Sequence, residues 1–432
     1  MVRRLDARGA DFESALTELI SAKRETDNDV AAVVRDIIAD VRMRGDVALA
    51  DYAWRFDKIE LTPDTLRVSQ AEIDAAEAQC PKAALDALDI AAKRIETYHR
   101  RQIPKDESFI DDAGATLGWR WTALDSVGLY VPGGTASYPS SVLMNAVPAR
   151  VAGVGRVAMV TPASNGAINP LVLAAARRAG VSEIYRTGGA QAIAALAFGT
   201  NSIVAVDKIV GPGNAYVAAA KREVFGHVGI DSIAGPSEIL IMADGKNNPD
   251  WIAADLLSQA EHDESSQSIL IADDAGFAAK VEQAIENALA ILPRKDIASA
   301  SWNKNGAIIL VADLKDAVSL VDRIAPEHLE IATENPQELF ARVRHAGAVF
   351  LGRNTPEAMG DYIAGPNHVL PTAHTARFSS GLSVLDFMKR TTVLSCSAQT
   401  INEIGPAAIT LAECEGLDAH ARSIAARLNI KK

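Results

Sequence analysis

The sequence has few cysteines, no long apolar run and no excess of basic residues, and each absence excludes a class of protein. Cys80, Cys396 and Cys414 are too few and too widely spaced for a disulfide framework, which favours a reducing cytosol. No apolar run approaches the ~20 residues of a membrane-spanning helix, and no apolar segment follows residues 1–6 as in a signal peptide. The formal net charge of −12 argues against nucleic acid or an anionic membrane as partner. The sequence therefore predicts a cytoplasmic protein with neither partner.

What is present is a globular composition, with 48% hydrophobic and 23% charged residues in a chain of 432, enough for two or more domains. Short apolar strands alternate with helices from residue 127 to 224 and again from 238 to 351. Such alternation indicates parallel sheets covered on both faces. Residues 1–126 are expected to be mostly helical, with a connector at 106–118, and residues 382–432 to form a small helical tail. This tail is too short to bury its own core and must pack on another surface.

Four polar side chains stand near the ends of predicted elements. Gln259 and His262 are three residues apart, so a helix presents both on one face. Asp361 follows a predicted strand, and His420 lies in the tail. Two imidazoles, a carboxylate and an amide oxygen suit Zn²⁺ in a site that exchanges ligands with a substrate. Only the fold can bring them together, and the alternative is four scattered surface side chains.

Glu327 and His328 are adjacent and suggest acid–base chemistry. Histidine needs little pKa adjustment to accept a hydroxyl proton near neutral pH, and a neighbouring carboxylate can orient water. The alternative is a pair that caps a helix end. His368 lies in a proline-containing loop and is a candidate substrate contact, whereas His99, followed by two arginines, is expected at a solvated helix end.

The nucleotide-binding evidence is limited to glycine-rich turns, because no Gly-x-Gly-x-x-Gly opens either α/β segment. Three such turns follow predicted strands: Pro132-Gly133-Gly134, Gly188-Gly189-Ala190-Gln191 and Gly211-Pro212-Gly213-Asn214. Each can bring backbone N–H groups close to an anion at the start of a helix. The alternative for each is a tight strand-to-helix turn with no ligand.

Together, the longer motifs resemble the histidinol dehydrogenase family over nearly the whole chain. The segments that carry this resemblance are residues 130–134 (YVPGG), 211–214 (GPGN), 230–238 (IDSIAGPSE), 259–263 (QAEHD), 325–330 (APEHLE) and 360–372 (GDYIAGPNHVLPT). The resemblance implies a homodimeric enzyme that uses one Zn²⁺ per subunit and NAD to oxidise L-histidinol to L-histidine, through histidinal, in two hydride transfers.

The resemblance also implies the roles of individual residues. The catalytic pair would be Glu327 and His328. The metal ligands would be Gln259, His262, Asp361 and His420. The substrate contacts would be Ser237, Gln259, His262, His328, Asp361, His368, Glu415 and His420. The NAD contacts would be Tyr130, Gln191 and Asn214. In the family the tail lends its histidine and glutamate to the active site of the other subunit.

The expected fold is α/β, with two incomplete Rossmann-like domains, an N-terminal helical arm and a helical tail. The arm is assigned to residues 1–25, and the first domain, carrying most metal and catalytic residues, to 26–126 and 237–381. The NAD-contacting domain is assigned to 127–236 and the tail, reaching the partner subunit, to 382–432. Two other functions stay open: a Zn-dependent hydrolase or lyase, which would form no NADH, and a non-catalytic two-domain binding protein, which would show no turnover.

Overall fold

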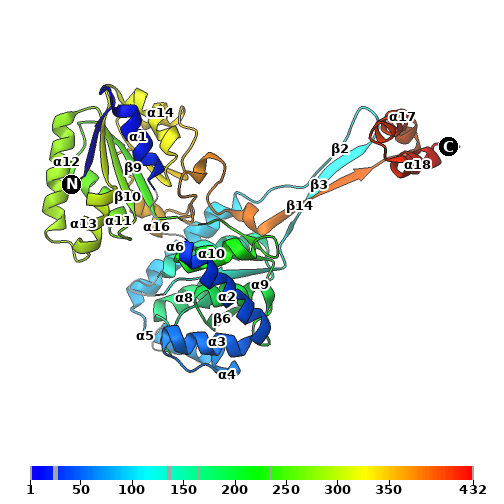
Figure 1. The fold of residues 1–432 in the computed structure, drawn as a ribbon, viewed down its shortest axis with the longest axis horizontal. Helices are drawn as coiled ribbons and strands as arrows, with labels where there is room; N and C mark the ends of the chain where they lie inside the picture. Colours follow the sequence, from blue (N-terminus) through cyan, green and yellow to red (C-terminus); the bar gives the residue numbers. More distant parts are fainter. Residues whose placement is uncertain (1, 23–27, 134–137, 164–165, 234, 431–432) are drawn as a thin grey trace.

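The computed structural model describes residues 2–22, 28–133, 138–163, 166–233 and 235–430 (Figure 1). Within them the chain forms two α/β bodies and a long arm that ends in a pair of helices. The expected α/β class with two parallel sheets is confirmed. Gly134 and Ala234 of the quoted motifs, and the boundary at residues 25 and 26, lie outside the described residues.

The first body contains a six-stranded parallel sheet in the order β1-β11-β10-β9-β12-β13. Its strands are β1 (Arg3–Asp6), β9 (Glu238–Ala243), β10 (Gln267–Ala272), β11 (Ala307–Leu310), β12 (His328–Ala332) and β13 (Ala348–Leu351). Its helices are α1 (Phe12–Ser21), α11 (Pro249–Ala260), α12 (Ala275–Leu289), α13 (Lys295–Asn305), α14 (Leu314–Ile324), α15 (Pro336–Phe340) and α16 (Glu357–Tyr362). Every residue of β9 and β10 is buried, because helices cover both faces of the sheet.

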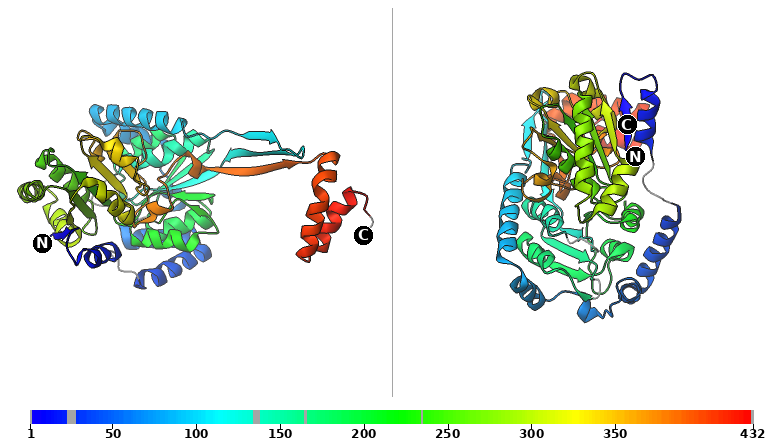
Figure 2. Two further views of the ribbon diagram at one scale, coloured as in Figure 1. Left: turned by 90° about the horizontal axis from the view of Figure 1, so that it is seen from above. Right: turned by 90° about the vertical axis from the view of Figure 1, so that its left-hand side faces the viewer.

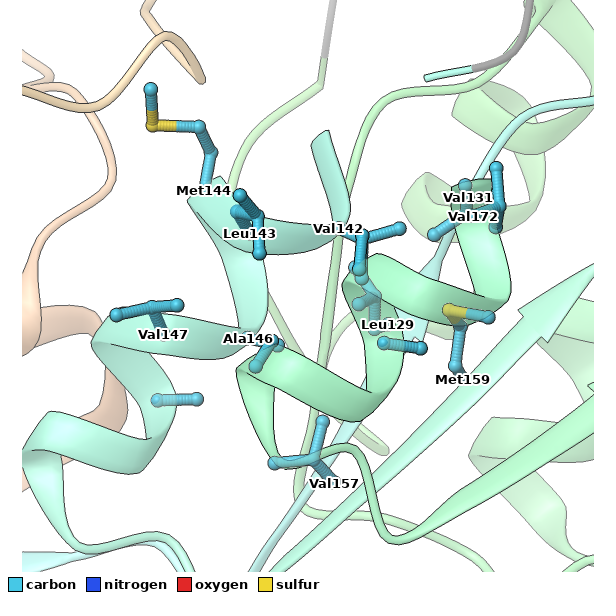
Figure 3. Close-up of a cluster of buried hydrophobic side chains, with 14 of the residues drawn as sticks. Leu129, Val131, Val142, Leu143, Met144, Ala146, Val147, Val157, Met159 and Val172 are labelled. Carbon is cyan, nitrogen blue, oxygen red and sulfur yellow. The ribbon is translucent and has the colours of Figure 1, made fainter. Parts of the chain in front are cut away.

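The second body contains a five-stranded parallel sheet in the order β6-β5-β4-β7-β8. Its strands are β4 (Ser126–Tyr130), β5 (Arg156–Thr161), β6 (Glu183–Arg186), β7 (Lys208–Val210) and β8 (Gly229–Ile230). Its helices are α7 (Pro139–Ala152), α8 (Pro170–Ala179), α9 (Gly189–Phe198) and α10 (Ala215–Val224). Figure 3 shows side chains of β4 and β5, such as Leu129 and Met159, in one apolar cluster with Val142 of α7 and Val172 of α8.

The N-terminal helices pack on the second body. This packing differs from the expectation, which grouped residues 26–126 with the first domain. These elements are α2 (Asn28–Arg44), α3 (Asp46–Tyr52), the π-helical η1 (Ala53–Asp57), α4 (Pro63–Leu66), α5 (Gln70–Gln79) and α6 (Lys82–Arg100). The apolar face of α2, with Val34 and Val41, shares a core with α9, while Ile95 of α6 shares one with α7 and α8. His99 is fully buried in α6, so the expected solvated position was wrong. The expected arm at 1–25 contributes β1 to the first sheet.

The arm is a three-stranded antiparallel sheet in the order β14-β3-β2, formed by β2 (Glu107–Ile110), β3 (Thr116–Ala123) and β14 (Met388–Ser395). Two expectations were therefore wrong: residues 106–118 are not a simple connector, and the start of the tail is a strand. β14 holds the β-branched Thr391, Thr392 and Val393, and it pairs along its whole length with β3. The short helices η3 (Thr375–Arg377) and η4 (Val384–Phe387) precede it.

The arm ends in α17 (Ala398–Cys414) and α18 (Asp418–Arg427), which lie far from both bodies (Figures 1 and 2). Their shared core is small and includes Ile409, Ala421 and Ala425. No helix among the described residues has both the length and the apolar character to cross a bilayer.

Candidate active site

The Glu327–His328 pair lies at the amino end of β12 in the first body. Neighbouring β9 begins at Glu238, and His328 is in register with Ile239. Parallel sheets more often place ligands at the carboxyl ends of their strands. In the second body the glycine-rich turns do follow the carboxyl ends of β4, β6 and β7. The candidate residues therefore lie at the amino edge of the first sheet and at the carboxyl edge of the second.

His328 is held in one tautomer by the backbone of β9. Its Nδ1 lies 2.9 Å from the carbonyl oxygen of Glu238. Because a carbonyl oxygen only accepts, Nδ1 carries the proton and Nε2 keeps its lone pair. Nε2 is buried, has no hydrogen-bond partner among the described residues and lies 3.6 Å from Oε1 of Glu357. Burial lowers the pKa of His328, so the ring is a neutral base at physiological pH.

Glu327 is held by the same residue of β9. Its Oε2 accepts a hydrogen bond from the backbone N–H of Glu238 at 2.9 Å and lies 3.7 Å from Nδ1 of His328. Burial raises the pKa of Glu327 well above its ordinary value. A carboxylate with a raised pKa is a stronger base once ionised, which suits it to activating water.

Glu357 is a third buried group that the sequence analysis did not single out. It begins α16, and its Oε2 accepts a hydrogen bond from the hydroxyl of Ser258 at 3.2 Å. Burial raises its pKa to about 7. Ligand atoms of His328, Glu357 and Asp361 lie within 4.8 Å of one another, close enough to hold a metal ion. Glu357 and Asp361 are four residues apart in the sequence, a spacing that puts both side chains on one face of a helix, and this was the available signal.

Three of the four expected metal ligands come from adjacent elements of the first body. Gln259 lies in the last turn of α11, and His262 follows it. Gln259 is 1% exposed, and its Oε1 accepts no hydrogen bond from any residue that the structure describes. Burial raises the pKa of Asp361, while the nearby imidazole of His262 acts in the opposite direction. A buried amide oxygen that accepts no hydrogen bond is costly, and a bound cation would satisfy it.

The fourth expected ligand lies elsewhere in this chain. His420 is exposed near the start of α18, and Glu415 is exposed at the end of α17. Both are on the helical pair beyond the arm, remote from the first body (Figure 1). A single chain therefore does not bring all the expected site residues together.

The expected substrate contacts Ser237 and His368 both lie near the catalytic pair. Ser237 immediately precedes β9. Both ring nitrogens of His368 are hydrogen-bonded. Nδ1 donates to the carbonyl oxygen of Asp361 at 3.0 Å, and Nε2 accepts from the hydroxyl of Ser141 at 3.3 Å. Burial lowers the pKa of His368 to about 4, so it is neutral. Ser141 belongs to α7, so this loop connects the two bodies, a contact that sequence reasoning missed.

The expected NAD contacts gather at the carboxyl edge of the second sheet. Tyr130 ends β4, and its hydroxyl accepts a hydrogen bond from the N–H of Gly189 at 3.1 Å. Burial raises the pKa of this phenol to about 12, so it stays protonated. Gln191 is buried in the first turn of α9, and Asn214 is the exposed N-cap of α10. Glycine-rich turns thus lie along the carboxyl edge of this sheet and precede two helices. Helix N-termini of this kind commonly bind anions.

Comparisons with known proteins agree with one another. A family model described as histidinol dehydrogenase matches residues 20–428. Histidinol dehydrogenase of Rhodospirillum rubrum is 64% identical over 430 residues, covering 99% of each chain. That of Bradyrhizobium diazoefficiens is 64% identical over 427 residues, again covering 99% of each. A crystal structure of histidinol dehydrogenase from Elizabethkingia anophelis is 37% identical, with a TM-score of 0.95 over 99% of this chain and 98% of that one.

Proposed function

The chain belongs to the histidinol dehydrogenase family, and we propose that it oxidises L-histidinol to L-histidine, through histidinal, with NAD as the hydride acceptor. The observation that carries this proposal is the buried, unprotonated Nε2 of His328, held by β9. It is the base that oxidation of an alcohol requires, in a chain that is similar to its relatives over its full length.

The first body offers a site for the zinc ion of this enzyme family. Gln259, His262 and Asp361 would hold the ion, and the buried Oε1 of Gln259, which has no hydrogen-bond partner within the described ranges, supports this assignment. When bound there, zinc would supply Lewis-acid chemistry and help to orient the substrate. Orientation of this kind is worth up to ~7–11 kcal/mol of the barrier in favourable cases.

The residues of the chain divide the proton transfers between them. Nε2 of His328 takes the hydroxyl proton while the hydride of the alcohol carbon passes to NAD⁺, which yields the aldehyde and NADH. Glu327, once ionised, takes a proton from the water that adds to the aldehyde. His328, having released its first proton, takes one from the resulting hydrate as the second hydride passes to a second NAD⁺. The products are the carboxylic acid and two NADH.

We further propose a homodimer in which Glu415 and His420 of the partner subunit complete each site. Within one chain these two side chains are remote from the first body. The arm and its helices also expose large apolar side chains: Ile110 is 73%, Leu394 64% and Leu411 65% exposed. Exposed apolar side chains gathered on a thin arm favour a surface that a second copy covers.

Mixed dimers test this sharing directly. One chain carries His262→Asn and the other His420→Asn, each with a different affinity tag, and the heterodimer is purified through both tags. If the tail serves the partner, one of the two sites regains a wild-type His262 and a wild-type His420. The mixed dimer is then active while each parent is not. If each site uses its own tail, both sites stay damaged and the mixed dimer is inactive.

A further inference from the structure

The turn after β7, Gly211-Pro212-Gly213-Asn214, is held by a buried ion pair that the proposed reaction does not use. The pair consists of Lys221 in α10 and Asp231 directly after β8. Their side chains are only 3% and 4% exposed. Such a pair stabilises a site only if hydrogen bonds satisfy the remaining polar atoms.

The remaining polar atoms are satisfied by one residue of the turn. Oδ2 of Asp231 accepts a hydrogen bond from the N–H of Gly211 at 2.8 Å. Nζ of Lys221 donates to the carbonyl oxygen of the same glycine at 3.0 Å, and it also contacts Oδ1 of Asp231. The ion pair thus binds both backbone polar groups of Gly211 and joins the end of β7 to α10 and β8.

Gly211 is also the point where the turn meets the rest of the NAD edge. Its φ is +109°, and a Cβ atom there would overlap with the carbonyl oxygen of Tyr130. At the other end of the turn, the side-chain oxygen of Asn214 accepts the N–H of Val217 at 3.2 Å as the N-cap of α10. The amide N–H groups of Asn214 have no partner in this cap and are the donors it offers to a ligand.

We propose that the Lys221–Asp231 ion pair is a positioning element that holds the 211–214 turn in the shape that binds NAD, without touching NAD. This inference rests on the proposed NAD contact of Asn214. The rival role for Lys221, attraction of the NAD pyrophosphate by its charge, is disfavoured because the ammonium group is buried and neutralised by Asp231. The two roles predict opposite results when the acidic partner is removed.

The test compares Lys221→Met with Asp231→Asn in the zinc-loaded dimer. These variants leave buried charges of opposite sign, and each weakens the hold on Gly211: methionine cannot donate to its carbonyl oxygen, and a neutral amide accepts from its N–H less strongly than a carboxylate does. A positioning role predicts that the KM and Kd for NAD rise about tenfold or more in both. The KM for histidinol and the zinc content stay close to wild type. If Lys221 attracts phosphate, NAD binding weakens in Lys221→Met and strengthens in Asp231→Asn, which would overturn the proposal.

Lys208→Met is the matched control. Lys208 starts the same strand β7, and its Nζ donates to the backbone oxygen of Asp386 at 2.7 Å and pairs with its carboxylate at 3.4 Å. This variant removes a lysine ion pair of the same body without touching the turn, so its KM for NAD should stay at the wild-type value. If the KM for NAD rises equally in this control, the Lys221 effect reflects a general loss of stability of the second body, and the positioning role is refuted.

Two further variants keep the outcome decisive. If a single variant fails to fold, Lys221→Met combined with Asp231→Leu removes both buried charges, and the KM for NAD must still rise because Gly211 has lost both partners. Asn214→Ala separates this inference from the proposed function. If it leaves NAD binding unchanged, the assigned NAD contact is wrong. If it weakens NAD binding while the ion-pair variants do not, the positioning role alone is wrong.

Discussion

Nδ1 of His328 lies 2.9 Å from the carbonyl oxygen of Glu238, and the N–H of the same Glu238 lies 2.9 Å from the carboxylate of Glu327. The backbone of one residue at the start of β9 therefore orients both members of the proposed catalytic pair. The pairing of β9 with β12 fixes this arrangement. His328 is thus the first residue of the sheet strand β12, and Glu327 directly precedes it and is tied to β9, which keeps the geometry of the pair precise.

Glu327→Gln should slow oxidation of histidinal more than oxidation of histidinol. The amide cannot take a proton from water, whereas His328 still accepts the hydroxyl proton in the first step. Loss of one acid–base group typically costs ~10²–10⁴-fold in rate. Single-turnover measurements of NADH formation from each substrate give the two rates separately. Equal slowing of both steps would contradict the assigned role.

His262→Asn should lose zinc and substrate affinity while it retains most NAD affinity. The imidazole belongs to the first body, near Asp361, whereas the proposed NAD contacts belong to the second. Metal analysis after dialysis and calorimetric titration with NAD measure the two properties on one sample. A full zinc content in this variant would refute the ligand assignment.

Gly211→Ala should destabilise the protein and weaken NAD binding more than Gly226→Ala does. Both glycines have a positive φ, +109° and +98°, so either substitution adds backbone strain of about 1–3 kcal/mol. A Cβ at Gly226 meets no atom within 4 Å, but one at Gly211 would overlap with Tyr130. That overlap should cost a further ~1–3 kcal/mol. Urea unfolding and NAD titration of both variants check this, and equal losses would contradict it.

Much of this architecture could be predicted from the sequence because it depends on local signals. The buried strand β9 was recognisable from its continuous apolar run, and α8 from the Pro170 start and Gly180 end. The candidate site residues could be named because they lie in long motifs that resemble those of a known family. These features need no knowledge of which distant segments meet.

The remainder depends on contacts between distant segments. β14 pairs with the distant β3, and its first residues, Met388-Lys389-Arg390, do not alternate as a strand does, although the β-branched residues after them favour one. The docking of α2 on α9 joins segments that are far apart in the sequence, and neither segment alone indicates the other. Glu357 resembled an ordinary helix-start acid until folding placed it beside His328.

The pH dependence of the unfolding free energy should reflect the lowered pKa of His99. This side chain is fully buried, with Nδ1 2.8 Å from the carbonyl oxygen of Ile95, and burial lowers its pKa below 6.5. Below about pH 6.5 the unfolded chain therefore binds a proton that the native state does not. The stabilising contribution is full above pH 6.5 and declines as the pH falls toward the native pKa, at ~1.4 kcal/mol for each tenfold difference in proton affinity.

His99→Leu removes this titration and keeps an apolar environment. The unfolding free energy of the metal-free wild type should fall more steeply than that of the variant between pH 7 and pH 5. Denaturant unfolding at several pH values measures both curves. Parallel curves would show that His99 titrates alike in the native and unfolded states.

Gln259, His262 and Asp361 of one subunit should share a single cation with His420 of the partner subunit. A crystal structure of the zinc-loaded dimer, with anomalous data at the zinc edge, tests it most directly. We expect one anomalous peak per site, in contact with the imidazole of His262 and with that of the partner's His420. A peak held by His328, Glu357 and Asp361 alone, with His420 in solvent, would contradict the account.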